Sequence, residues 1–186
     1  MPFTFSPCAI AGLYEIQPEV FGDERGYFLE SYTQRDFVTA GITLPFVQDN
    51  QSCSKKGTLR GLHFQKTYPQ GKLVRALQGE IFDVAVDLRP HSPTLGKWHS
   101  VVLSGDKQNQ FYVPPGFAHG YLALSEQVIF AYKCTDFYYP GDEGGIIWND
   151  PVLGVSWPDL GMKYILAEKD RKWPLFDRSQ EYSFGQ

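Results

Sequence analysis

The side chains best suited to chemistry in this sequence lie in a few short segments. One segment places His63 between Arg60 and Lys72, and Tyr132 and Asp170 follow later in the chain. Imidazole exchanges protons near neutral pH, so His63 is a candidate base. A phenol with an ordinary pKa near 10 is a poor acid toward oxygen but an adequate one toward an enolate carbon, and Lys72 could stabilise an enolate oxygen. These residue types predict proton transfer beside a carbonyl group.

Each of these residues also has a simpler interpretation. A single histidine is most often a hydrogen-bonded core residue, Tyr132 could fill the core, and Lys72 could be a solvated strand lysine. Asp170 could hold His63 in its productive tautomer, a role for which Asp83 is an equal candidate. Because Asp170 lies in the charged run EKDRK, spacing alone favours a solvated carboxylate.

The backbone must bring these groups to one face. In a regular strand Arg60 and His63 point to opposite faces, so a shared site requires a bulge, for which Gly61 is suited. Period-two alternation from residue 130 to 138 places Tyr132 and Tyr138 on the same face. We therefore expect irregular backbone at Gly61 and a pocket that both tyrosines face.

The composition favours an all-β fold. Aromatic residues make up 16% of the 186 residues, and 18 Gly and 13 Pro supply turns between short strands. The spacing predicts a sandwich or jelly roll in one domain over residues 1–186, with loops from Asp150 onward and one helix over 34–40. The clearest strands are expected at residues 59–64, 72–77, 81–88, 97–103, 110–113, 120–124 and 128–138.

Charge and cysteine content restrict the partners and the compartment. A net charge of −4 and a pI near 5.5 predict no nucleic-acid surface, so an anionic small-molecule substrate would need a local cluster of cations. We find no basic leader and no segment long enough to span a membrane. Three cysteines make a poor disulfide framework and have no metal-type spacing. We expect a cytoplasmic protein with reduced thiols and no membrane partner.

The histidines match the two cupin metal motifs only in part. His63 and PPGFAH with His119 fit, but the usual H-x-H is His63-Phe64-Gln65 here, and no glutamate follows at the usual offset. His91 and His99 lie elsewhere, in a segment expected to be exposed. Two histidines without further ligands make a poor transition-metal site, so no metal is predicted.

Taken together, the motifs resemble those of the dTDP-4-dehydrorhamnose 3,5-epimerase family of dTDP-L-rhamnose biosynthesis. The resemblance extends from about Phe21 to Pro174. It rests on FGDERGYFLESY, FVQDNQS, LRGLHFQ, QGKLVRALQGEIFDVAVDLR, PPGFAHGYLALSE, YKCTDFYYPGDEGGIIWNDP and AEKD. It implies a cupin-type jelly roll (a double-stranded β-helix) with a few short helices.

The resemblance also implies roles for individual residues. His63 would be the base, Tyr132 the proton donor on the opposite face of the sugar, Asp170 the partner of His63, and Lys72 the contact to the carbon-4 ketone oxygen. Phe28 and Tyr138 would pack on the nucleotide, although whether Tyr138 gates the ring is left open. The remaining substrate-binding set would be Arg25, Glu30, Gln48, Asn50, Arg60, His119, Glu143 and Lys169.

The resemblance also implies a homodimer in which N-terminal strands cross the interface, which leaves open whether Arg25 and Glu30 serve their own site or the partner's. The predicted reaction is epimerisation of dTDP-4-dehydro-6-deoxy-D-glucose at carbons 3 and 5 to dTDP-4-dehydro-L-rhamnose, through an enolate and without a cofactor. Three alternatives are an epimerase acting on a single carbon of a related deoxysugar, a metal-dependent cupin enzyme, and a non-catalytic sugar-binding jelly roll.

Overall fold

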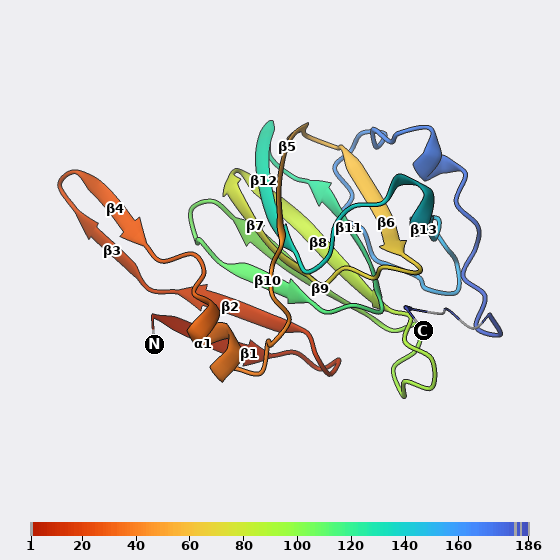
Figure 1. The fold of residues 1–186 in the computed structure, drawn as a ribbon. Helices are drawn as coiled ribbons and strands as arrows, with labels where there is room; N and C mark the ends of the chain where they lie inside the picture. Colours follow the sequence, from red (N-terminus) through yellow and green to blue (C-terminus); the bar gives the residue numbers. More distant parts are fainter. Residues whose placement is uncertain (1, 181, 183, 186) are drawn as a thin grey trace.

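Two antiparallel sheets packed face to face form the body of the protein (Figure 1). The structure, a computed structural model, describes residues 2–180, 182, 184 and 185. The six-stranded sheet has the order β1 (Phe3–Pro7), β2 (Tyr14–Pro18), β10 (Gln110–Val113), β7 (Lys72–Gln78), β12 (Gln127–Cys134) and β5 (Gln48–Lys55). The five-stranded sheet has the order β13 (Glu143–Gly145), β6 (Leu59–Gln65), β11 (Phe117–Ala123), β8 (Glu80–Asp87) and β9 (Trp98–Ser104).

The core lies between the sheets because strand alternation turns apolar residues inward. Val74 of β7 and Phe130 of β12 meet Ile81 and Ala85 of β8 in one cluster. Within β8, Val84 and its same-face neighbours join a second cluster that the C-terminal segment covers. The five-stranded sheet is thus buried on both faces, as expected for a central strand of period-two apolar residues. This arrangement is a cupin-like jelly roll, as the sequence predicted.

The remaining elements are short. The helix α1 (Gln34–Thr39) matches the prediction for residues 34–40 and packs Phe37 edge-on against Phe3 and Phe5 of β1. Two 3-10 turns, η1 (Pro140–Asp142) and η2 (Lys169–Arg171), lie in the C-terminal half. No helix among the described residues is long and apolar enough to cross a membrane.

A third, two-stranded sheet projects from the body. The hairpin of β3 (Val20–Asp23) and β4 (Gly26–Leu29) extends away from the sandwich, at the left of Figure 1. Within the segment FGDERG the turn is confined to Glu24 and Arg25, because the other four positions pair as strand.

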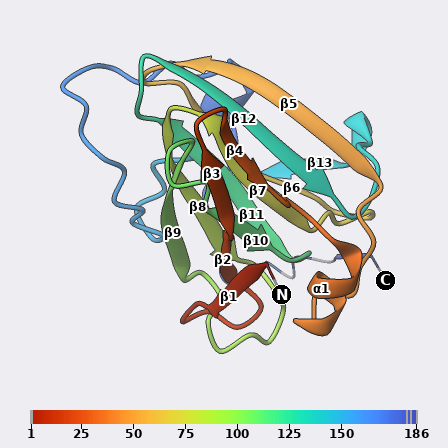
Figure 2. The same ribbon diagram turned by 90° about the vertical axis from the view of Figure 1, so that its left-hand side faces the viewer.

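One edge of the sandwich is formed by β5, a strand of mostly polar residues. Figure 2 shows β5 and β12 side by side at the upper right, whereas β9, at the other edge of the sandwich, lies at the left. The sequence missed β5 because it reads QDNQSCSK, which is almost wholly polar. Alternate residues of β5 nevertheless turn toward the inside of the sandwich, and they help to line a cavity there.

Candidate active site

A cavity of about 580 Å³ opens between the two sheets at the β5 and β12 edge. The sheets supply most of its wall, and the segment from Ile165 to Asp170 closes one side. The four predicted catalytic residues, His63, Lys72, Tyr132 and Asp170, all line it. So do seven residues of the predicted binding set, Gln48, Asn50, Arg60, His119, Tyr138, Glu143 and Lys169.

A bulge in β6 brings Arg60 and His63 to the same face. His63 pairs with His119 of β11 and Arg60 pairs with Tyr121, so three steps along β6 match two along β11. Gly61, at φ +120°, makes the bulge possible, because a Cβ there would lie 2.5 Å from the Cα of Gly120. The predicted irregularity at Gly61 is confirmed, and Arg60 and His63 line the same cavity.

His63 is held by a buried carboxylate. Its Nε2 lies 2.5 Å from Oδ1 of Asp170, which is 1% exposed. Because an ionised carboxylate only accepts hydrogen bonds, Nε2 carries the proton, and Nδ1 of the neutral ring keeps the lone pair. That nitrogen faces Oε1 of Glu143 at 3.8 Å. The interpretation of Asp170 as a solvated charge is therefore wrong.

Several groups keep Asp170 ionised. Burial raises the pKa of this carboxyl, but the hydrogen bond and charge of His63, the Trp173 indole and the Lys169 charge outweigh it. The net pKa lies below the ordinary value. The Trp173 indole donates to the same Oδ1 at 3.3 Å. The sequence assigned no role to Trp173, and its contact with Asp170 three residues earlier becomes visible only in the folded turn.

Asp83, the rival partner for His63, binds a different histidine. Nε2 of His119 donates to Asp83 at 2.8 Å and 3.0 Å, and both residues are buried. The two residues face each other across β8 and β11, where Asp83 pairs with Tyr121 and His119 with Ala85. Both histidines line the cavity, and each is bonded to a different aspartate.

Tyr132 approaches from the opposite sheet. It lies in β12 between Asn50 of β5 and Val74 of β7. Burial raises the pKa of Tyr132 to about 12, with smaller contributions from neighbours such as Cys134 and an opposing effect of the Arg60 charge. The phenol therefore keeps its proton at neutral pH. Tyr138 also lines the cavity, as predicted, although β12 ends at Cys134 and a loop carries Tyr138 there.

Two lysines, Lys72 and Lys169, also line the cavity. Burial lowers the pKa of Lys72, while the charges of Cys134, Asp83 and Glu143 oppose the shift. Nζ of Lys169 donates to both oxygens of Glu143, at 2.7 Å and 2.8 Å.

Two serines of β5 bond to residues of the cavity wall, and Ser52 itself lines the cavity. Nε of Arg60 donates to Oγ of Ser54 at 3.2 Å, and the hydroxyl of Tyr121 lies 3.0 Å from both Ser52 and Ser54. The sequence analysis did not predict a role for these serines. Their two-residue spacing in QSCSK does indicate that both lie on one face of a strand.

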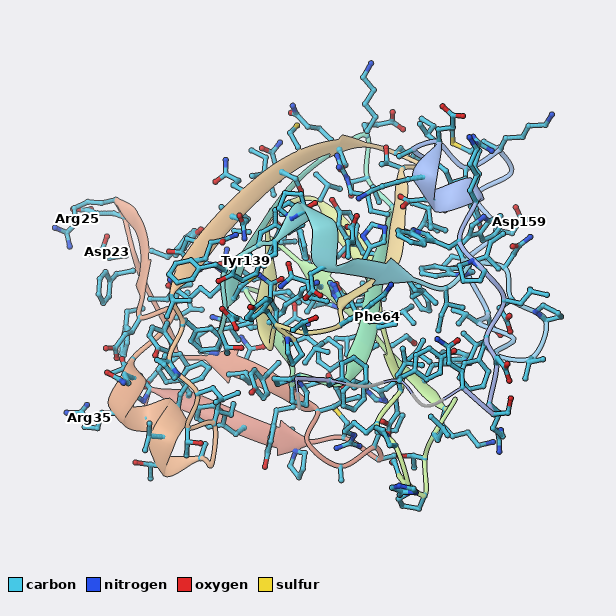
Figure 3. All side chains as sticks on the ribbon, turned by 45° about the vertical axis from the view of Figure 1, so that its right-hand side comes forward. Asp23, Arg25, Arg35, Phe64, Tyr139 and Asp159 are labelled. Atoms are coloured by element: carbon cyan, nitrogen blue, oxygen red, sulfur yellow. The ribbon has the colours of Figure 1, made fainter. Side chains whose placement is uncertain are left out.

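Three predicted binding residues do not line the cavity of their own chain. Arg25 lies at the tip of the hairpin and bonds Asp23, and Figure 3 places both far from Phe64, which lines the cavity. Phe28 is 70% exposed on the same hairpin. Glu30 follows β4 and accepts a hydrogen bond from the Thr33 hydroxyl.

Comparison with known proteins identifies the family. The sequence profile of the dTDP-4-dehydrorhamnose 3,5-epimerases matches residues 7–178. The chain belongs to the dTDP-4-dehydrorhamnose 3,5-epimerase family. It is therefore an epimerase, one of the isomerases.

Individual members of the family are similar over nearly their whole length. The dTDP-4-dehydrorhamnose 3,5-epimerase of Methanothermobacter thermautotrophicus is 51% identical, over 92% of this chain and 93% of that protein. The Pseudomonas aeruginosa enzyme of the same name is 53% identical, over 90% and 93%. The crystal structure of the Legionella pneumophila enzyme RmlC, in complex with dTDP-4-keto-L-rhamnose, matches with a TM-score of 0.94 at 46% identity, covering 99% of both chains.

Proposed function

We propose that this epimerase converts dTDP-4-dehydro-6-deoxy-D-glucose to dTDP-4-dehydro-L-rhamnose, with His63 as base and Tyr132 as acid. The observation that carries the assignment is that a carboxylate-held imidazole and a protonated phenol, from opposite sheets, line one cavity. The Legionella pneumophila relative was crystallised with dTDP-4-keto-L-rhamnose, which supports a substrate of this class.

The reaction needs a base and an acid on opposite faces of the sugar ring. Nδ1 of His63 removes the proton from a carbon beside the C4 ketone, and the C–H electron pair moves into an enolate. Tyr132 then delivers a proton to the other face of that carbon, which inverts it. The cycle leaves an imidazolium and a phenolate, and exchange with water restores both. The same steps at the carbon on the other side of the ketone complete the 3,5-epimerisation.

Electrostatic stabilisation must supply much of the rate. General acid–base catalysis typically contributes about a hundred- to ten-thousandfold. Lys72 lines the cavity and is placed to neutralise the enolate oxygen, the kind of contribution that exceeds proton transfer in many enzymes. Arg60 and Lys169 would offset the diphosphate charge, which the net charge of −4 otherwise repels.

The active form is a homodimer in this proposal. The β3–β4 hairpin carries a cluster of exposed apolar side chains, with Phe21 52%, Tyr27 62% and Phe28 70% exposed. Such a cluster is costly in water and is typical of an interaction surface. Arg25, Phe28 and Glu30 do not line the cavity of their own chain. If the hairpin docks on a second copy of the protein, these three residues would reach the cavity of the partner.

Solvent isotope exchange tests the reaction. In deuterated water the product should carry deuterium at both C3 and C5, because each carbon loses its proton to His63 and receives another from the solvent-exchanged Tyr132. Label at one carbon alone would show a single-carbon epimerase instead. Tyr132→Phe should lose most epimerisation, whereas Tyr112→Phe, a buried tyrosine outside the cavity, should keep it.

A second variant separates catalysis from binding. His63→Ala should lower turnover by about a thousandfold or more while affinity for a dTDP-sugar largely survives. His91→Ala, at an exposed position, is the matched control. Full turnover in His63→Ala would remove His63 as the base and favour a binding role for the cavity.

A further inference from the structure

Three side chains with metal-ligating atoms meet at the edge of the sandwich opposite the cavity. They are Cys8, Glu15 and His99, and their Sγ, carboxylate oxygen and imidazole nitrogen all lie within 4.8 Å of one another. None of them lines the active-site cavity. Their position is therefore independent of the epimerase chemistry.

Strand pairing brings Cys8 and Glu15 together on one face. In the β1–β2 hairpin Ser6 pairs with Glu15, and the pairing continues past the end of β1, where the Cys8 amide donates to the Leu13 carbonyl at 3.0 Å. Cys8 lies two residues beyond Ser6, so it points to the same side as Glu15. Diagonal neighbours of this kind are within reach of each other's side chains.

His99 comes from the other sheet and points toward the same space. It pairs with Ala85, whose side chain lies in the core between the sheets. Its ring packs 5.9 Å from that of Phe111, which pairs with Glu15. The sequence placed His99 on an exposed segment, but its side chain is 25% exposed and its Nε2 lies 3.3 Å from Oε1 of Glu15.

We propose that Cys8, Glu15 and His99 bind a zinc ion that joins the two sheets at this edge. Thiolate, imidazole and carboxylate are the three ligand types that zinc takes from proteins, at about 2.0–2.3 Å. A tetrahedral ion with such bonds separates its ligand atoms by about 3.3–3.6 Å. The 3.3 Å between His99 Nε2 and Glu15 Oε1 already matches, and the Cys8 thiol, within 4.8 Å of both, would have to move closer by at most about 1.5 Å.

The surroundings suit a structural ion with one water. Cys8 packs partly against the core, while the Glu15 side chain is 48% exposed and leaves a fourth position open to solvent. The ligands belong to the β1–β2 hairpin of one sheet and to the edge strand β9 of the other. Zinc would supply a cross-sheet link there, and its binding energy would add to the stability of the fold.

Cobalt titration tests the site in the full chain, without a histidine tag, after reduction and treatment with a chelator. One equivalent of Co²⁺ should produce thiolate-to-cobalt charge-transfer absorption, and Zn²⁺ should displace it. Cys8→Ser should abolish the absorption. Glu15→Gln and His99→Gln should weaken metal binding by more than about tenfold. Substitutions of residues that only support metal ligands already cost about tenfold in affinity, and loss of a ligand should cost more. Cys53→Ser, at an exposed thiol elsewhere, should change nothing.

Thermal unfolding provides the second measurement. Zn²⁺ should raise the Tm of the wild type by a few degrees and leave the Tm of Cys8→Ser unchanged. Epimerase turnover should be the same with and without the ion, so the outcome is separate from that of the His63 test. Absorption that persists in Cys8→Ser, binding without a thiolate band, or turnover that falls when the metal is removed would each overturn the proposal.

Discussion

Two histidines line the cavity, each paired with an aspartate, and the backbone holds the two pairs differently. His119 and Asp83 lie on adjacent central strands in regular register, and their side chains are 8% and 0% exposed. His63 lies beyond a bulge, is 21% exposed, and is held by Asp170 from a 3-10 turn of the C-terminal segment. The His119–Asp83 pair is thus a buried, fixed structural pair, whereas the His63–Asp170 pair presents its histidine to the cavity.

The difference shows how a rigid sandwich provides a reactive group. Tyr132 and Lys72 reach the cavity from regularly paired strands, whereas Arg60 and His63 share the cavity face because β6 is bulged. The bulge turns His63 toward the cavity, and the distant Asp170 orients it from behind. We expect substitutions around His63 to affect turnover, and equivalent substitutions around His119 to affect stability and substrate affinity.

Replacing the two aspartates gives the largest expected contrast. In Asp170→Asn the amide donates to Nε2, so the ring proton moves to Nδ1 and the base lone pair is lost. We expect kcat to fall by about a hundred- to ten-thousandfold, within the range for a base held in the wrong tautomer. Asp83→Asn should change kcat by less than about tenfold. Steady-state kinetics of both variants checks this, and equal losses in kcat would contradict the distinction between the pairs.

Gly61→Ala should disrupt the bulge and is the next largest effect. The new Cβ would lie 2.5 Å from the Cα of Gly120 and 2.8 Å from the His119 carbonyl oxygen. Backbone atoms cannot move aside easily, so we expect a loss of about 3 kcal/mol or more in the free energy of unfolding, together with lower turnover.

Gly26→Ala is the matched control for this change. Gly26 has a similar φ of +127° but nothing lies within 4 Å of a Cβ there. It should lose only the cost of the unfavourable φ, about 1 kcal/mol. Chemical denaturation of both variants at one protein concentration measures the difference. Equal losses would mean that close approach to β11 does not set the requirement for glycine.

The bulge is also an instance of what the sequence could predict. Arg60 and His63 are three residues apart, so in a regular strand they would point to opposite faces. A shared site therefore required an irregularity, and Gly61 was the residue best suited to it. Asp170 shows the opposite case. Its neighbours are charged, so local sequence indicated a solvated side chain, whereas its burial depends on packing of the tail against β6.

Tertiary contact explains the other failures. The polar strand β5 has no apolar alternation because it faces solvent on one side and the cavity on the other. Cys8 and His99 are 91 positions apart in the numbering and meet only because their strands lie at the same edge of the sandwich. Hydrophobic periodicity and secondary-structure propensity predict single strands and helices. Neither predicts which strands come to lie next to each other in the folded protein.

Trp173→Phe tests the support of Asp170 from behind. It removes one indole donor from Oδ1, and a single hydrogen bond contributes about 1 kcal/mol, so we expect a loss of roughly fivefold in kcat with little change in KM. Because the Trp173 hydrogen bond lowers the pKa of Asp170, its removal raises that pKa, and the part of the acid limb of the kcat profile that follows protonation of Asp170 should move to higher pH.

The control for this variant is Trp157→Phe, which removes an indole donor to the Trp148 carbonyl outside the cavity. It should leave both kcat and its pH profile unchanged. If Trp157→Phe reproduces the shift of the acid limb, the effect of Trp173 would be a general loss of packing.

The smallest expected effect is on acid stability. The folded pKa of Asp170 lies below its unfolded value near 3.9 because His63, Trp173 and Lys169 together outweigh the effect of burial. The stabilisation is therefore fully present above that unfolded value and is lost as pH falls through the folded one. One such proton contributes a slope of at most about 1.4 kcal/mol per pH unit. Urea denaturation between pH 6 and acid conditions should show a shallower loss for Asp170→Asn than for the wild type, and parallel curves would mean that the pair with His63 adds nothing to folding.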